Sequence, residues 1–211
     1  MTARIIGIGA YAPEQVVTNQ DLTKFLDTND AWIRERTGIG ARHVSTSEGT
    51  SALATEAVKR AIADAGISPE EIEIVIVATS SPDRAFPSAA DVQGAIGAKH
   101  AVAFDITAAC SGFIYALHIV QGFIQAGIYK TALIIGAETL SKVLDWTDRS
   151  SCILFGDGAG AAVVRADETG VVKTLVGSDG TKNDVLYCQA RSLENCLTGG
   201  KPELGFMQMD G

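Results

Sequence analysis

Two runs of consecutive apolar, largely β-branched residues constrain the fold most strongly. They span Ile72 to Ala78 and Thr131 to Ala137. A strand that is apolar at every position has both faces covered, which is typical of a sheet packed between helices. Helix-like segments lie between and around these runs. The chain is therefore expected to be an α/β protein with a mixed or parallel sheet.

Capping residues, glycine stops and apolar periodicity predict the remaining elements. Further strands are expected over Ala3–Ile8, Val102–Ile106, Cys152–Phe155, Ala161–Arg165 and Val171–Val176, with a glycine-rich turn between the third and the fourth. Helices are expected from Asn19 to Leu26, Thr28 to Arg36, Thr50 to Ala65, Pro87 to Gly97 and Cys110 to Ala126, with Asn19 and Thr28 as caps. Beyond Gly177 the pattern weakens into loop. Gly205 to Gly211 ends without a closing element, so the chain is expected to be cut short.

Composition narrows the class of protein. The chain has 211 residues, of which 46% are hydrophobic and 20% charged, and this balance favours a well-packed globular protein. The net charge of −8 makes nucleic acid and an anionic membrane unexpected partners. Met1 to Gly9 lacks the features of a signal peptide, and no window approaches the ~18 apolar residues that span a bilayer. A cytoplasmic protein is expected.

The four cysteines show neither a C-x-x-C pair nor the spacing of metal ligands. They are Cys110, Cys152, Cys188 and Cys196. We interpret them as free thiols in a reducing compartment, and we expect no metal site.

Cys110 has the most informative surroundings of the four. It lies at the start of a helix that is apolar nearly all round, among small residues that leave space beside the thiol. The N–H groups and partial positive charge of a helix N-terminus favour a thiolate. The same N–H groups could stabilise the oxyanion that forms when the sulfur attacks a thioester. From these features alone, a nucleophile and a small buried core cysteine remain equally open.

The segment from Phe104 to Phe113 (FDITAACSGF) resembles the nucleophile motif of the beta-ketoacyl-acyl carrier protein synthase III family. Four other segments agree with that family in order and spacing. They are Asp30–Ile39 (DAWIRERTGI), Ala85–Ala89 (AFPSA), Thr147–Arg149 (TDR) and Phe155–Val163 (FGDGAGAAV). The resemblance runs from about Arg4 to the last residue.

The resemblance implies a thiolase-like fold, in which two similar halves stack into αβαβα layers, usually as a homodimer. Residues 1–170 would form the N-terminal half with the nucleophile, and residues 171–211 would lead into a truncated C-terminal half. It also implies acyl transfer from acyl-CoA to Cys110, followed by decarboxylative condensation with malonyl-acyl carrier protein at the start of fatty acid synthesis. No cofactor is implied, because coenzyme A arrives as part of a substrate.

Family positions also map onto other residues of this chain. The coenzyme A contacts fall on Thr28, Trp32, Arg36 and Arg149, with Trp32 and Arg149 suited to stacking on adenine and Arg36 to phosphate. Phe86 matches a residue that reaches across the dimer to close the partner's acyl pocket. Without the resemblance, the first four would be interpreted as plain surface residues and Phe86 as core. The primer, acetyl or branched, does not follow from the sequence.

One departure from the family concerns its catalytic His and Asn, which assist decarboxylation and lie in the second half. The sequence ends at Gly211, before either position. The three histidines, His43, His100 and His118, are poor substitutes. His118, for example, lies about 12 Å along the helix from Cys110 by helix rise. Each histidine is expected to be structural.

Three other hypotheses remain. Gly156 to Ala161 and Gly7 to Ala12 each fit the dinucleotide-binding pattern G-x-G-x-x-A, but neither opens a helix as that site requires. The chain could also be an inactive half-domain that assembles with another polypeptide. Finally, it could be a sibling condensing enzyme of secondary metabolism, although the WIRERTGI and AFPS segments favour synthase III.

Overall fold

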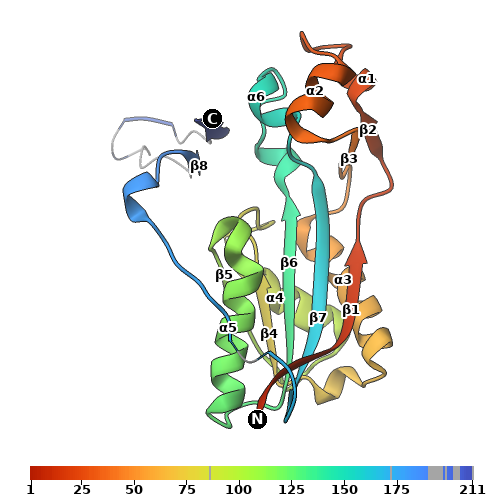
Figure 1. Ribbon diagram of the computed structural model, residues 1–211, viewed down its shortest axis with the longest axis vertical. Helices are drawn as coiled ribbons and strands as arrows, with labels where there is room; N and C mark the ends of the chain where they lie inside the picture. Colours follow the sequence, from red (N-terminus) through yellow and green to blue (C-terminus); the bar gives the residue numbers. More distant parts are fainter. Residues whose placement is uncertain (86, 172, 190–196, 198, 202–204, 211) are drawn as a thin grey trace. The chain divides into compact units, whose positions relative to one another are not determined.

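The computed structural model describes residues 1–85, 87–171, 173–189, 197, 199–201 and 205–210 (Figure 1). The chain divides into two compact units. The sheet unit comprises Met1–Glu14, Ser45–Thr139 and Asp157–Val176, and the second unit comprises Gln15–Val44, Leu140–Gly156 and Gly177–Gly211. Phe86 and Cys196 lie outside the described residues. The expected division after residue 170 stays a prediction.

A mixed five-stranded sheet forms the centre of the sheet unit, as the α/β pattern predicts. Its strand order is β1-β7-β6-β4-β5. Strand β4 pairs in parallel with β5 and β6, whereas β7 pairs antiparallel with β6 and β1. The strands are β1 Thr2–Tyr11, β4 Ile74–Ala78, β5 Val102–Ile106, β6 Thr131–Thr139 and β7 Asp157–Asp167.

Helices cover both faces of this sheet, which explains the uninterrupted apolar runs. Val75 and Val77 of β4 pack into one cluster, and Ile74 and Ile76 pack into another. The first cluster includes residues of α3 (Thr50–Ala65) and α4 (Ser88–Ile96), and the second includes residues of α5 (Gly112–Gln125). Figure 1 shows the sheet between α5 and the other two helices. A strand alternates its side chains between faces, so both faces need apolar residues.

Close contact between β1 and α3 explains why β1 has glycine at positions 7 and 9. A Cβ at Gly7 would lie 2.5 Å from the carbonyl oxygen of Ala61, and one at Gly9 would lie 2.2 Å from that of Ala57. These glycines therefore admit the backbone of a helix instead of opening one. The dinucleotide-binding hypothesis loses support at this position.

The second unit has its own small core around Leu22, Ile33, Leu144 and Cys152. Buried Arg42 ties the unit together, because it donates hydrogen bonds to the carbonyl oxygens of Val17 and Ile153 and to Asn19 Oδ1. Its helices are α1 Asn19–Leu22, α2 Asp30–Thr37 and α6 Arg149–Cys152, and its strands are β2 Val16–Thr18, β3 Ala41–His43, β8 Leu186–Cys188 and β9 Met207–Met209. Short 3₁₀ turns complete the two units at Pro69–Glu71, Ala109–Ser111, Leu140–Val143 and Gly180–Lys182.

Two expected strands are wrong. Cys152 to Phe155 forms no strand, because Asp148 caps α6 through the N–H of Ser150 and the helix continues to Cys152. Gly156 directly precedes β7, and Gly158 and Gly160 lie within it, where Gly160 pairs with Gly136 on one side and Ala10 on the other. Of Val171 to Val176, Val171 makes an isolated bridge to Ala3 and 173–176 are not in a strand, while 172 lies outside the described residues.

Helix caps and the chain end also differ from expectation. Thr18 caps α1 in a capping box with Asp21, and Asn29 caps α2 by accepting from the N–H of Trp32. Asn19 is instead buried and donates to Asp30 Oδ1 and the carbonyl of Ile39. Near the last residue, β9 pairs with β8, so this segment does contain an ordered element. No helix among the described residues is both long and apolar enough to cross a membrane.

Candidate active site

Cys110 lies exposed on the turn that joins β5 to α5. The helix itself begins at Gly112, two residues later than expected, and a 3₁₀ turn over Ala109–Ser111 carries the thiol. The Ser111 side chain makes no capping hydrogen bond to α5. The thiol therefore precedes a helix N-terminus whose first amides lack a side-chain cap, an arrangement compatible with stabilising an anion.

The backbone just before the thiol is strained. Ala109 has a φ of 45°, and among the described residues it is the one non-glycine residue with a positive φ. For a residue with a side chain, the left-handed region costs about 1–2 kcal/mol. Such strain is concentrated at functional sites, where the surrounding structure maintains it. Cys110 is thus presented by a turn that ordinary loop preferences would not form.

Gly112 allows this turn to lie against the sheet. A Cβ at Gly112 would lie 2.8 Å from the Cβ of Ala78, the last residue of β4. Such a contact is closer than real Cβ atoms tolerate, so any side chain at this position would push the start of α5 away from the strand. The small residues of the motif therefore serve helix packing as well as access to the thiol.

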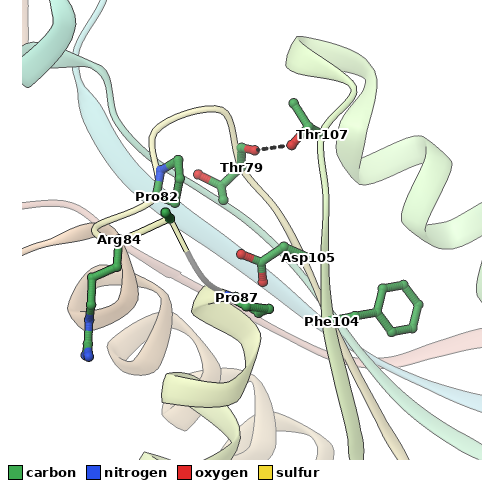
Figure 2. Close-up of a pocket in the computed structure, with 8 residues that line it drawn as sticks. Thr79, Pro82, Arg84, Pro87, Phe104, Asp105 and Thr107 are labelled. Atoms are coloured by element: carbon green, nitrogen blue, oxygen red, sulfur yellow. Dashed lines mark hydrogen bonds between the residues drawn. The ribbon is translucent and has the colours of Figure 1, made fainter. Parts of the chain in front are cut away.

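A cavity of about 260 Å³ lies between the end of β5 and the loop that leads to α4 (Figure 2). Its lining residues are Thr79, Pro82, Arg84, Ala85, Pro87, Phe104, Asp105 and Thr107. Thr107, which borders it, precedes Cys110 by three residues, at most about 11 Å of extended chain. Phe86, the predicted acyl-pocket residue, follows a lining residue in sequence but falls outside the described part of the chain.

Three carboxylates attach this loop to its surroundings. Glu138 accepts from the N–H of Ser80 at 2.8 Å, and Asp83 accepts from the N–H groups of Thr50 and Ser51 at 2.7 and 2.8 Å. Asp105 accepts from the N–H groups at the start of α4. Sequence reasoning missed all three carboxylates, although Asp105 lies within the recognised motif. No local signal in the sequence identifies them, because each accepts from residues at least 16 positions away.

Two of the three histidines lie on regular elements, His43 on β3 and His118 on α5. His118 Nδ1 makes a short hydrogen bond to Thr174 Oγ1 on the exposed side of α5. His43 is part of β3 and belongs to the second unit. Their expected structural role stays a prediction.

In the second unit, three of the predicted coenzyme A contacts form one cluster. The Trp32 ring lies 4.3 Å from the guanidinium carbon of Arg36 and 4.9 Å from that of Arg149. Arg149 also donates to the carbonyl oxygen of Asp27 at 2.7 Å. Thr28, which follows Asp27 in the chain, has a buried Oγ1 with no hydrogen-bond partner among the described residues. The cluster of Trp32, Arg36 and Arg149 combines an aromatic face with two positive charges.

Comparison with known proteins decides the family. The family model for 3-oxoacyl-[acyl-carrier-protein] synthase III matches residues 104–180. The beta-ketoacyl-[acyl-carrier-protein] synthase III of Clostridium acetobutylicum is 54% identical over 202 residues, which cover 95% of this chain and 62% of that protein. The beta-ketoacyl-[acyl-carrier-protein] synthase III of Ehrlichia canis is 51% identical over 200 residues, which cover 92% of this chain and 63% of that protein. This chain belongs to the synthase III family.

Solved structures agree with the synthase III assignment. The 3-oxoacyl-[acyl-carrier-protein] synthase III of Aquifex aeolicus VF5 matches with a TM-score of 0.88 and 45% identity, over 98% of this chain and 64% of that one. The priming beta-ketosynthase of the R1128 polyketide pathway matches with a TM-score of 0.89 and 33% identity, over 99% and 63%. These likenesses confirm the expected thiolase-like synthase fold. The chain spans fewer than two thirds of the length of these synthase III relatives.

Proposed function

We propose that the protein is a beta-ketoacyl-acyl carrier protein synthase III that condenses an acyl-CoA primer with malonyl-acyl carrier protein. The observation that carries the proposal is Cys110, exposed on a strained turn before α5 and inside the segment that the family model matches. A thiol presented in this way suits covalent catalysis. The fold and family alone would not identify the residue that reacts.

The proposed reaction has two halves. First, the Cys110 thiolate attacks the thioester carbonyl of acyl-CoA, and the carbon–sulfur bond to coenzyme A breaks as its thiol leaves with a proton. The N–H groups at the start of α5 stabilise the oxyanion. Second, malonyl-acyl carrier protein loses CO₂, and the resulting carbanion attacks the acyl-Cys110 carbonyl. The Cys110 thiolate leaves, and 3-ketoacyl-acyl carrier protein is released.

The cluster around Trp32 is proposed to bind coenzyme A. The Trp32 ring offers a stacking surface for adenine, and the exposed guanidinium of Arg36 offers a charge for phosphate. Arg149 and the unpartnered hydroxyl of Thr28 supply further donors. We assign no cofactor to the reaction.

We further propose a cytoplasmic homodimer in which Phe86 reaches the partner's acyl pocket. The free thiols of Cys110, Cys152 and Cys188 suit a reducing compartment. The edge position of β5 supports self-association, because an edge strand offers unpaired backbone groups and Val102 on it is exposed.

A second candidate is a condensing enzyme of secondary metabolism. The similarity to a polyketide-priming ketosynthase favours it, because that protein shares the fold at nearly the same TM-score as the synthase III structure. The two candidates differ in the primer that they accept and not in the nucleophile.

Steady-state condensation distinguishes these proposals. The full-length protein is incubated with malonyl-acyl carrier protein and either acetyl-CoA or a longer acyl-CoA, and the 3-ketoacyl product is measured. We expect product with acetyl-CoA and none after Cys110→Ala. Product with the longer primer only would favour the secondary-metabolism candidate. Undiminished product with Cys110→Ala would refute the proposed role of Cys110.

A further inference from the structure

Asp105 joins two segments that both border the cavity. One carboxylate oxygen accepts from the N–H of Ser88 at 2.6 Å, and the other accepts from the N–H of Ala89 at 2.7 Å. Ser88 and Ala89 are the first two residues of α4, and both are buried. The interaction therefore links β5, which leads to Cys110, to the far end of the loop that lines the cavity.

A second tie joins the same strand end to the near end of the loop. Thr107 Oγ1 donates to the carbonyl oxygen of Thr79 at 3.3 Å, as Figure 2 shows. Thr79 directly follows β4, so the loop is held to the nucleophile strand both where it begins and where it ends. Asp105 and Thr107 themselves line the cavity, and Figure 2 shows the Asp105 side chain beside Pro87.

Asp105 holds the loop more strongly than Thr107 does, because it accepts two hydrogen bonds on a charged group whereas Thr107 donates one to a neutral carbonyl. Its carboxylate satisfies two N–H groups that a helix start would otherwise leave unpaired, and a hydrogen bond to a charged group is stronger than one between neutral groups. Asparagine has nearly the same shape but presents an NH₂ group to one of those two donors. The substitution thus breaks one bond without removing the side chain.

We propose that Asp105 is a positioning residue that holds the cavity wall formed by residues 79–85 and 87–88 in a fixed place relative to the Cys110 turn. In this way Asp105 sets the size of the group that reaches the thiol. Where the group that reaches the thiol is an acyl chain, this proposal rests on the proposed function. Loss of the tie lets the wall move outward. Larger groups then gain access relative to small ones, whereas a merely structural residue would slow groups of every size by the same factor.

The test compares selectivity, not overall rate, in the full-length protein. Alkylation of Cys110 by N-ethylmaleimide and N-octylmaleimide is followed by peptide mapping, and acyl transfer to Cys110 from acetyl-CoA and octanoyl-CoA is followed by intact mass. With Asp105→Asn we expect the long-to-short rate ratio to rise by about fivefold or more in both assays, as the loss of one such bond allows. The control is Asp167→Asn, since Asp167 also accepts from a backbone N–H, that of Thr169 at 2.8 Å, but does not line the cavity. It should leave the ratio unchanged.

Each outcome decides the proposal. An unchanged ratio in folded Asp105→Asn, or an equal fall for both reagent lengths, would overturn it. If Asp105→Asn fails to fold, Thr107→Val breaks the other tie with little change of shape, and an unchanged ratio in that variant would overturn the proposal instead. The maleimide assay needs no acyl transfer. A raised maleimide ratio in a protein that takes no acyl group from any acyl-CoA would therefore support the positioning role and refute the proposed function.

Discussion

The guanidinium carbon of Arg149 lies 4.9 Å from the centre of the Trp32 ring, and the same guanidinium donates to the carbonyl of Asp27. Two groups that stack on opposite faces of a third flat ring are about 7 Å apart, twice an ordinary carbon contact. A base inserted between Trp32 and Arg149 must therefore move the guanidinium outward. Arg149 thus covers the surface that we propose for adenine.

Replacing Trp32 should weaken substrate binding more than chemistry. Trp32→Ala is expected to raise KM for acyl-CoA about 5- to 30-fold, the equivalent of about 1–2 kcal/mol, with kcat nearly unchanged. Steady-state kinetics with varied acyl-CoA measure both constants. The matched control is Phe25→Ala, which removes an exposed aromatic ring of the same unit. A large fall in kcat at constant KM would contradict the binding role of Trp32.

Gly112 should not tolerate a methyl group, whereas Gly122 on the same helix should. Gly112→Ala places its Cβ 2.8 Å from that of Ala78, and overpacking of this kind costs about 1–3 kcal/mol. Among the described residues, nothing lies within 4 Å of where a Cβ at Gly122 would be, so Gly122→Ala should stabilise the helix by about 0.8–1 kcal/mol. Chemical denaturation measures both changes. Equal effects of the two substitutions would show that α5 does not pack on β4 as described.

The strain at Ala109 predicts opposite effects for a smaller and a larger residue. Ala109→Gly should keep or raise stability by up to about 1 kcal/mol, because glycine adopts positive φ without penalty. Ala109→Val should lower stability, since a β-branched residue at positive φ is a genuine outlier. Thermal unfolding of the two variants tests this order. A more stable valine variant would mean that the turn does not have positive φ at Ala109.

Cys152 should behave as an inert thiol at alkaline pH. Burial raises the pKa of Cys152 from 9.0 to about 11. Below pH 9 both the folded and the unfolded thiol are protonated, but between about pH 9 and 11 only the unfolded thiol ionises. Stability attributable to Cys152 should therefore fall as pH rises through this window. Denaturation of the parent and of Cys152→Ala across that range should show a shallower decline in the variant, and parallel declines would contradict the assignment.

The regular elements of the sheet unit were predictable because their signals are local. The consecutive apolar residues of β4 and β6 and the glycine stop after α3 lead directly to the observed elements. By contrast, Cys152 to Phe155 has the apolar content of a strand, but α6 runs from its cap at Asp148 to Cys152 and no strand follows before Asp157. Such a competition between local interactions is not visible in the apolar pattern.

The candidate site was predictable only in part. Cys110, Trp32, Arg36 and Arg149 came from matching motifs, and the structure brings the last three together. The contacts of Asp105 with Ser88 and Ala89 depend on how β5 and α4 pack, which no local pattern specifies. The positive φ of Ala109 is likewise imposed by tertiary packing, because alanine itself disfavours it.

The central claim, that Cys110 forms the acyl-enzyme, is tested most directly by incubating the full-length protein with acetyl-CoA and mapping the acetylated peptide by mass spectrometry. The account predicts one acetyl group, on Cys110, that disappears with Cys110→Ala and persists with Cys152→Ala. An acetyl group found on Cys152, Cys188 or Cys196 while Cys110 stays unmodified would contradict it.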